Sequence, residues 1–251
     1  MIIESTSNST IKELAKLAHK KDRDAKNMFL VEGEHLLQEA KQAGVLLRVF
    51  QRSDLDRFDF DDVTLCSQAV LNKLSTQKSD AKYIGLCKMM KHKAETNDSL
   101  SLGKRILILD HLQIPGNMGT LIRSACSFGI DQIIYSKDCA DPYGPKTIQS
   151  TQGALFHVSL LEADLLEVIP TLKKRLPVFG AALHHDSIEL HDLKIPEEFA
   201  IIIGNEGQGI RQEVLDLCSD LVHIEMQSFE SLNASIAGSI LMYAFQFPSK
   251  S

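Results

Sequence analysis

The 251-residue sequence lacks the features that mark several large classes of protein. It contains no run of 18 or more apolar residues, so it predicts no membrane-spanning helix. Its first residues have no basic stretch followed by an apolar one, which argues against a secretory signal. It also has neither a Gly-Lys-Ser/Thr phosphate loop nor a Gly-x-Gly-x-x-Gly fingerprint after a strand, which argues against a P-loop enzyme or a nucleotide-dependent oxidoreductase.

Cysteine is scarce and scattered. The five cysteines are odd in number and form no Cys-x-x-Cys pair, so they predict reduced thiols in a cytoplasmic protein, not a disulfide framework or a zinc site. They are Cys66, Cys87, Cys126, Cys139 and Cys218. His184, His185 and His191 lie close together but lack the ligand spacing of a metal site, so we expect a surface loop and no metal.

Excess positive charge, common in nucleic-acid binders, is also missing, because the net charge is −6. The balance is uneven: residues 1–98 carry 16 Lys and Arg against 15 Asp and Glu (+1), and residues 99–251 carry 11 against 18 (−7). Six basic residues cluster early, at Lys12, Lys16, Lys20, Lys21, Arg23 and Lys26. Taken alone, this charge pattern favours a solvated helix face. A phosphate-binding surface is the alternative interpretation.

Residues 1–90 alternate between helix and strand patterns. Apolar spacing predicts helices over 8–20, 35–44 and 68–74. Strand-like runs occupy 29–33, 45–50, 63–66 and 83–89. This alternation predicts a small α/β sandwich. Residues 91–104 are polar and without periodicity, as in a linker.

A second α/β series occupies residues 105–251. The run RILILD at 105–110 is continuously apolar until its end, which is typical of a strand buried on both faces of a parallel sheet. Further strands are expected at 132–136, 177–183, 199–204 and 221–226, and helices at 120–129, 166–175 and 232–245. We expect a loop at 141–146 and another apolar segment at 154–160.

The first polar motif, NMGTLIRSA at 117–125, lies between a strand and a helix. Ligands bind at the carboxyl ends of parallel strands, where loops and helix N-termini converge. Asn117 offers a donor and an acceptor, and Arg123 lies about one turn into the expected helix. Taken alone, the motif also fits a plain strand–helix turn with a surface arginine.

The second motif, GNEGQGI at 204–210, follows a strand of β-branched residues. Gly204, Gly207 and Gly209 permit tight turns. The carboxylate of Glu206 would repel phosphate but would suit a cationic or hydroxyl-bearing ligand.

The third motif, SLNASIA at 231–237, leads from a loop into a helix rich in small residues, which favour close helix packing. Taken alone, Ser231 fits an ordinary helix N-cap equally well.

In this order and at these separations, the three motifs resemble the signatures of the SpoU (TrmH-like) family of RNA ribose methyltransferases, part of the SPOUT superfamily. The resemblance spans about 105–246 and includes DPYGPKTIQSTQGALFHVSL at 141–160. The segment KLAHKKDRDAKNMFLVEGEHLLQEA at 16–40 is similar to the RNA-binding domain of many members, which shares the fold of ribosomal proteins that grip bent RNA.

The resemblance implies an activity and an organisation. The activity is methyl transfer from S-adenosylmethionine to a ribose 2′-hydroxyl, with ribosomal RNA favoured over transfer RNA. Residues 1–90 would bind RNA, and residues 105–251 would form a SPOUT domain whose parallel sheet contains a deep trefoil knot. Members are typically dimers. The alternatives are a transfer RNA enzyme and a non-catalytic RNA-binding or ribosome-assembly factor.

Site residues follow from the matched motif positions. The catalytic-type positions are Arg123, Asn117, Glu206, Ser231 and Asn233. The cofactor-binding positions are Ile203, Gly204, Asn205, Gly207, Ile224, Met226, Leu232 and Asn233. Three positions depart from the family pattern: Ile114 stands where Asp is frequent, Glu225 where Pro is frequent, and Ser228 where Gly is frequent. The side chain of Glu225 would place a negative charge next to the expected cofactor loop, where it would either weaken cofactor binding or point outward.

The last expected helix, 232–245, is apolar or small on nearly every face. A surface helix shows a polar stripe, so this helix should be buried on several sides. One side would cover the cofactor, and another, including Met242 and Phe245, would meet a second subunit across a two-fold axis. Burial within one large domain is the alternative.

Overall fold

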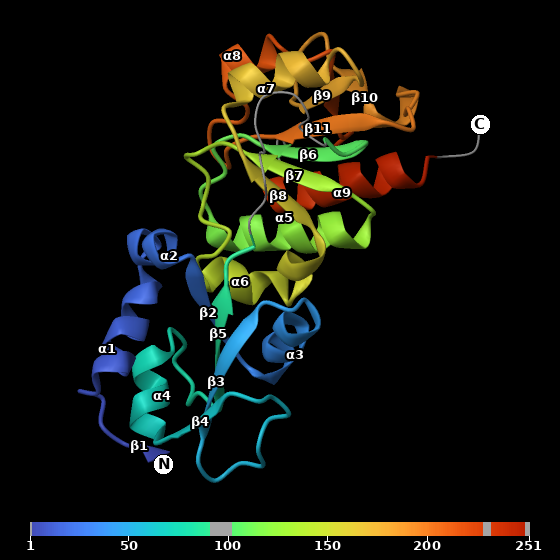
Figure 1. The fold of residues 1–251 in the computed structure, drawn as a ribbon. Helices are drawn as coiled ribbons and strands as arrows, with labels where there is room; N and C mark the ends of the chain where they lie inside the picture. Colours follow the sequence, from blue (N-terminus) through green and yellow to red (C-terminus); the bar gives the residue numbers. More distant parts are fainter. Residues whose placement is uncertain (1, 91–101, 228–231, 249–251) are drawn as a thin grey trace. The chain divides into compact units, whose positions relative to one another are not determined.

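Two separate β-sheets organise the chain in the computed structural model, which describes residues 2–90, 102–227 and 232–248 (Figure 1). One sheet belongs to a unit formed by Met1–Lys91 together with Asp141–His157. The other belongs to a unit formed by His92–Ala140 and Val158–Ser251.

The first unit contains a mixed five-stranded sheet in the order β1-β4-β3-β5-β2. Its strands are β1 (Ile2–Ile3), β2 (Met28–Glu32), β3 (Leu46–Arg52), β4 (Val63–Cys66) and β5 (Tyr83–Lys88). Its first four helices are α1 (Ser9–Ala15), α2 (Lys20–Lys26), α3 (Glu34–Gln42) and α4 (Gln68–Leu74). This is the small α/β arrangement that the sequence predicts.

The helix expected over 8–20 is broken. Asn8 caps α1, because its Oδ1 accepts hydrogen bonds from the backbone N–H groups of Thr10 (2.9 Å) and Ile11 (3.4 Å). A 3₁₀ turn, Lys16–Ala18, follows, and α2 begins afresh at Lys20. The early basic cluster therefore spans two short helices, and one member, Arg23, is only 3% exposed.

Residues 141–157 pack within the first unit, although the sequence analysis assigned them to the second domain. They form α6 (Pro145–Thr151) and the 3₁₀ turn η2 (Ala154–His157). The Tyr143 ring lies 5.0 Å from Phe29, its hydroxyl donates to the Met90 carbonyl (3.2 Å), and Asp141 forms an ion pair with the buried Arg23. A cut in the linker would therefore not give a complete first unit.

The second unit contains a seven-stranded sheet in the order β10-β12-β9-β11-β6-β7-β8, and every neighbouring pair is parallel. Its strands are β6 (Arg105–Leu109), β7 (Gln132–Tyr135), β8 (Ser159–Glu162), β9 (Val178–Ala181), β10 (Ile188–Glu189), β11 (Phe199–Ile203) and β12 (Asp220–His223). The predicted parallel α/β fold is confirmed, and the two most apolar strands, β6 and β11, pair at its centre.

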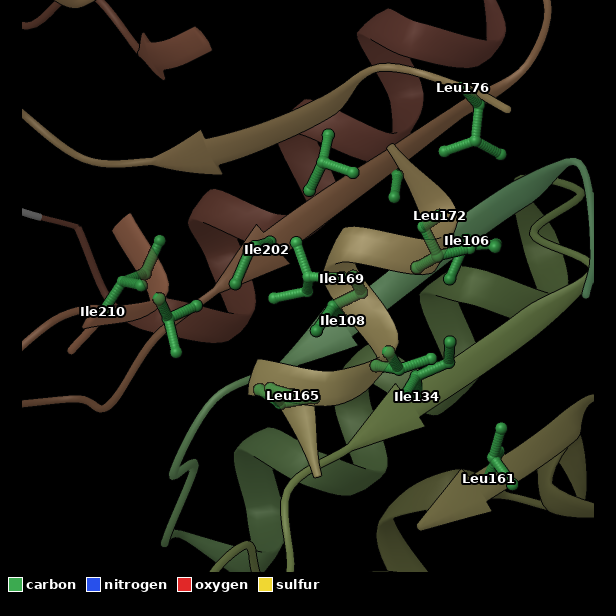
Figure 2. Close-up of a cluster of buried hydrophobic side chains, with 14 residues drawn as sticks. Ile106, Ile108, Ile134, Leu161, Leu165, Ile169, Leu172, Leu176, Ile202 and Ile210 are labelled. Atoms are coloured by element: carbon green, nitrogen blue, oxygen red, sulfur yellow. The ribbon is translucent and has the colours of Figure 1, made fainter. Parts of the chain in front are cut away.

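Helices cover both faces of this sheet (Figure 1). On one face, α7 (Leu165–Leu172) and α8 (Gln212–Leu215) pack on the strands. Figure 2 shows this core, in which Ile169 of α7 lies among Ile108 of β6 and Ile202 of β11. The opposite face is covered by α5 (Pro115–Ser127) and α9 (Ala234–Gln246).

Close packing of α9 depends on Gly238. A Cβ added there would lie 2.5 Å from Leu121 of α5 and 3.2 Å from Ile203 of β11. A small residue in α9 thus lets this helix approach both neighbours closely, as the sequence predicts.

The outward face of α9 is not the one predicted. Met242 is fully buried, and Phe245 is 3% exposed with its ring 4.9 Å from Phe199 of β11. Both therefore face the sheet. The exposed apolar face is formed by Ile236, Ile240, Tyr243 and Phe247, which are 37–56% exposed.

Two further findings concern helix limits. The helix expected at 120–129 begins five residues earlier, because Pro115 occupies its first turn, where a missing N–H costs nothing. Asn117 therefore lies in a helix and not in the preceding loop. Within the described residues, no helix combines the length and apolar character that a membrane crossing requires.

Candidate active site

A cavity of about 430 Å³ opens in the second unit at the carboxyl ends of β9, β11 and β12. Its walls come from the loop that follows β11, the residues that follow β12 and the first turns of α9. Seven of the eight predicted cofactor-binding residues line it: Ile203, Gly204, Asn205, Gly207, Ile224, Met226 and Leu232. The eighth, Asn233, is the N-cap of α9 at the edge of the same region.

The loop after β11 closes tightly on itself. Asn205 and Gly209 exchange backbone hydrogen bonds of 2.9 and 3.0 Å, and the Asn205 Oδ1 accepts from the N–H groups of Gly207 and Gln208. A Cβ on Gly204 would lie 2.3 Å from backbone atoms of Gly209 and of the residue after it, so only glycine fits. This turn is what exposes the loop backbone to the cavity.

An ion pair that the sequence analysis missed fixes the far end of this loop. Asp110, directly after β6, is fully buried, and its carboxylate accepts from the Arg211 backbone N–H (2.9 Å), Nε (2.9 Å) and Nη2 (2.7 Å). A carboxylate at the end of a buried parallel strand is the sequence signal that would have pointed to it.

Glu206 binds the start of α5. Its Oε2 accepts from the Gln113 backbone N–H (3.0 Å), and its Oε1 accepts from the Ile114 N–H and from Asn117 Nδ2 (both 2.9 Å). Burial raises the pKa of the Glu206 carboxyl, but the hydrogen bonds outweigh burial and the pKa lies below its ordinary value. Glu206 is therefore an anionic cap at a helix N-terminus.

Asn117 links the second motif to the third. Its Oδ1 accepts from Asn233 Nδ2 (3.1 Å) and from the Ser235 hydroxyl (3.3 Å), while Asn233 Oδ1 accepts from the backbone N–H groups of Ser235 and Ile236. Each amide faces a group that can only accept or only donate, so both amide orientations are determined. Ser235 is a site residue that the sequence analysis did not single out.

Arg123 lies apart from this network. Its side chain is exposed on α5, and within the described residues it forms neither an ion pair nor a side-chain hydrogen bond. The structure thus brings Asn117, Glu206 and Asn233 together but does not bring Arg123 to them. Ser231 lies outside the described residues, as does Ser228.

The remaining departures from the family pattern leave the cavity intact. The Ile114 side chain is 48% exposed, and only its backbone N–H serves the site, through Glu206. Glu225 lies between the cavity residues Ile224 and Met226, but its carboxylate pairs with His191.

His111 is a further residue of the site that the sequence did not point to. It has a left-handed backbone (φ 57°), which is uncommon outside glycine, and its carbonyl accepts from Asn205 Nδ2 (2.8 Å). His111 therefore holds the cavity loop from the strand β6 side. No pattern in the sequence predicts this backbone conformation at His111.

The cavity suits a cofactor that combines a nucleoside with an amino acid. Its volume lies in the range of about 300–1,000 Å³ that is usual for small-molecule sites. One part of the lining is apolar, including Ile203, Ile224 and Leu241, and another is the polar turn at Asn205–Gln208. Such a lining can enclose an adenine ring and still offer backbone hydrogen bonds to polar groups.

Two groups of exposed side chains that could hold a metal ion lie outside the cavity lining. They are His184 with His185 and Asp186, and Glu189 with His191 and Glu225. Within each group the potential ligand atoms lie within 4.8 Å of one another.

Comparison with known protein families identifies relatives of this chain. A model of the SpoU rRNA Methylase family matches residues 104–243, more than half of the chain. The chain belongs to the SpoU rRNA methylase family. A second model, an MRM3-like substrate binding domain, matches residues 8–85.

Individual relatives cover nearly the whole chain. The 23S rRNA (guanosine(2553)-2′-O)-methyltransferase RlmP of Bacillus subtilis is 31% identical over 96% of this chain and 97% of its own length. A crystal structure of an RNA 2′-O ribose methyltransferase is 30% identical, covers 97% of both chains and has a TM-score of 0.82. The AdoMet complex of AviRb from Streptomyces viridochromogenes is 22% identical, covers 95% of this chain and 97% of its own, and shares the fold (TM-score 0.84).

As a member of this family, the SpoU methylase described here is an S-adenosylmethionine-dependent RNA ribose 2′-O-methyltransferase with a SPOUT fold.

Proposed function

We propose that this methyltransferase modifies a ribose of ribosomal RNA, and that the cavity beside β11 holds S-adenosylmethionine. The observation that carries the proposal is the hydrogen-bonded network of Glu206, Asn117 and Asn233, which joins all three motifs beside the cavity. Ribosomal RNA is favoured because the Bacillus subtilis relative acts on 23S rRNA.

The eight cofactor-binding positions have distinct tasks in this proposal. Gly204, Asn205 and Gly207 present loop backbone to the cofactor, whereas Ile203, Ile224, Met226 and Leu232 enclose it. Asn233 holds the start of α9 against Asn117. S-adenosylmethionine supplies a methyl group already activated on a sulfonium, so the protein has to align the acceptor and stabilise its developing charge.

Arg123 is the residue that we assign to the acceptor. A guanidinium stays protonated in proteins, so it is a poor proton acceptor but a good donor to phosphate and to a developing alkoxide. The exposed, unpaired side chain within the described residues leaves it available to RNA. Glu206, Asn117 and Asn233 then act by fixing α5, the helix that carries Arg123. Ser231 is assigned to this site from its motif position alone.

A homodimer is the proposed assembly. The apolar face of α9, formed by Ile236, Ile240, Tyr243 and Phe247, is a continuous exposed stripe at helical spacing. Because α5 runs alongside α9, linked through Ser124 and Ser239, a second subunit on this face would also approach Arg123. This is the arrangement expected of a family whose active sites lie near subunit interfaces.

RNA capture is assigned to the first unit. Lys12 and Lys21 extend from exposed positions on α1 and α2, whereas Lys16 and Lys26 share Glu13 as an ion-pair partner. The match of residues 8–85 to a substrate-binding domain supports this assignment. We further propose the trefoil knot of the family for the second unit, on the ground of family membership. We also propose a cytoplasmic location, supported by the five scattered cysteines of the sequence, which form no Cys-x-x-Cys pair.

Mapping ribose methylation in a strain that lacks the gene tests the proposal. One 2′-O-methyl group should disappear from ribosomal RNA and return when the gene is restored. If the methyl group disappeared from transfer RNA instead, transfer RNA would be the substrate. If neither RNA lost a methyl group, the proposal would be contradicted.

A further inference from the structure

A side-chain contact joins the two chains just after the end of the strand pair β10–β12. The parallel ladder pairs Ile188 with Val222 and Glu189 with His223. Two residues further along each chain, His191 lies in the 3₁₀ turn η3 (Leu190–Asp192), and Glu225 follows the end of β12. There the Glu225 Oε1 accepts from the His191 backbone N–H (3.0 Å) and contacts the ring Nδ1. The Glu225 carboxylate thus ties the turn after β10 to the chain that follows β12.

This contact fixes the part of the chain that forms one wall of the cofactor cavity. Ile224 and Met226 line the cavity on either side of Glu225. Glu225 binds His191 while both of its neighbours line the cavity, so this contact holds the segment that carries Ile224 and Met226. The family frequently has proline at the position of Glu225, and the ring of proline restricts the backbone angle φ. Glu225 has no such restraint of its own.

The surroundings of His191 are acidic. Its ring faces three carboxylates: Glu225, Glu189 (3.6 Å) and Asp192 (3.3 Å). The hydrogen bond to Glu225 and the charges of Asp192 and Glu189 raise the pKa of His191. Burial raises the pKa of Glu225, but the hydrogen bonds from His191 bring it below its usual range. Both shifts favour a charged pair.

We propose that His191 is a positioning residue for cofactor binding: its pairing with Glu225 holds the Ile224–Met226 wall in place of the family's proline, and makes cofactor affinity depend on pH. The inference rests on the proposed function, because it requires S-adenosylmethionine in this cavity. His191 does not line the cofactor cavity and is not a catalytic residue.

The sign of the pH dependence follows from the direction of the shift. His191 has a raised pKa in the folded protein, so its charged contact is complete below the ordinary histidine pKa and is lost as pH rises through the raised value. The backbone hydrogen bond to Glu225 does not titrate with the ring and remains. Affinity should therefore fall, but not vanish, on the alkaline side.

The test is calorimetric titration of the full-length protein with S-adenosylmethionine between about pH 6 and about pH 9. At the acidic end, His191→Ala and Glu225→Gln should each weaken binding about two- to fivefold, the range of an exposed ion pair. At the alkaline end they should match the wild type. In assays the KM for the cofactor should rise with kcat unchanged. His185→Ala is the control, since His185 pairs with Asp186 and not with Glu225.

A second variant guards against a general loss of structure. Glu225→Pro should restore a ring restraint, and adding His191→Ala to it should have no further effect. If the wild type binds and every variant binds equally at all pH values, the inference is wrong. If EDTA weakens wild-type binding as much as His191→Ala does, the cluster holds a metal and the ion-pair assignment is overturned. If the wild type does not bind the cofactor, the proposed function itself fails.

Discussion

The Nδ2 of Asn117 lies 2.9 Å from Oε1 of Glu206, and this hydrogen bond joins the first motif to the second across 89 residues of chain. The other end of the Asn117 amide accepts from Asn233 of the third motif. Three segments that are distant in the sequence therefore share one network. Its members have their hydrogen-bonding groups largely occupied by one another, which suits them to hold the site in shape.

Glu206→Ala should destabilise the protein and weaken cofactor binding. The change removes the acceptor for the Gln113 and Ile114 N–H groups and for Asn117, at an expected cost of about 1–3 kcal/mol. Thermal unfolding measures the first effect and calorimetry the second. Gln208→Ala, an exposed side chain in the same loop, is the control for stability. Equal melting temperatures for the two variants would contradict the capping role.

Acid should remove the same contribution in the wild type. Because the pKa of Glu206 is lowered in the folded protein, its stabilisation is complete above the ordinary carboxyl pKa and is lost as pH falls through the lowered value. The difference in unfolding free energy between wild type and Glu206→Gln should be constant above about pH 5 and shrink below it. A difference that grows in acid would show that the sign is wrong.

Gly204→Ala should disrupt the loop after β11 and abolish cofactor binding. Gly207→Ala should leave the conformation of this loop unchanged. The added Cβ at position 204 would lie 2.3 Å from loop backbone, but at position 207 its nearest neighbour is Asn205 Oδ1 at 3.7 Å, an ordinary contact. Circular dichroism and calorimetry on both variants compare them directly. Cofactor binding by Gly204→Ala would mean that the loop does not need its tight closure.

Ile240→Glu should give monomers that have lost most of their activity. Ile240 lies at the centre of the exposed apolar face of α9, and a buried unpaired carboxylate there would oppose association. Sedimentation measures the outcome. Leu166→Glu is matched in exposure but lies on α7, on the other face of the sheet, and should leave the assembly unchanged. A wild type that is monomeric and fully active would end the dimer proposal.

Arg123→Ala should abolish methyl transfer while the cofactor dissociation constant changes by less than about threefold. The reason is that Arg123 contacts none of the described cavity network, so its loss should fall on the step that involves RNA. Lys174→Ala, which also removes an exposed positive charge, is the control. Turnover of Arg123→Ala near that of the wild type would remove it from the reaction.

Much of the second unit could be predicted from the sequence because its signals are local. The strands β6 and β11 are continuous apolar runs, and the turn after β11 needs glycine where no Cβ fits. Seven predicted cofactor residues line one cavity for the same reason: the carboxyl ends of parallel strands meet at one edge of a sheet.

What could not be predicted depends on contacts between distant segments. Glu206 caps α5 from 92 residues away, so the partner that caps this helix cannot be read from the sequence of the helix itself. The sequence around Arg23 predicts a surface charge, but in the structure Arg23 pairs with Asp141, which lies 118 residues further along the chain. The face that α9 turns outward is ambiguous in sequence because an apolar helix has no polar stripe to orient it.

The most direct test of the account is the chemical nature of the product. Purified protein should transfer a labelled methyl group from S-adenosylmethionine to unmodified ribosomal RNA, and complete digestion should yield a single labelled 2′-O-methylnucleoside. The methylated linkage should also resist alkaline cleavage, because the 2′-hydroxyl that attacks the phosphate is blocked. A label on a base, or no transfer to RNA by a protein that binds the cofactor, would contradict the account.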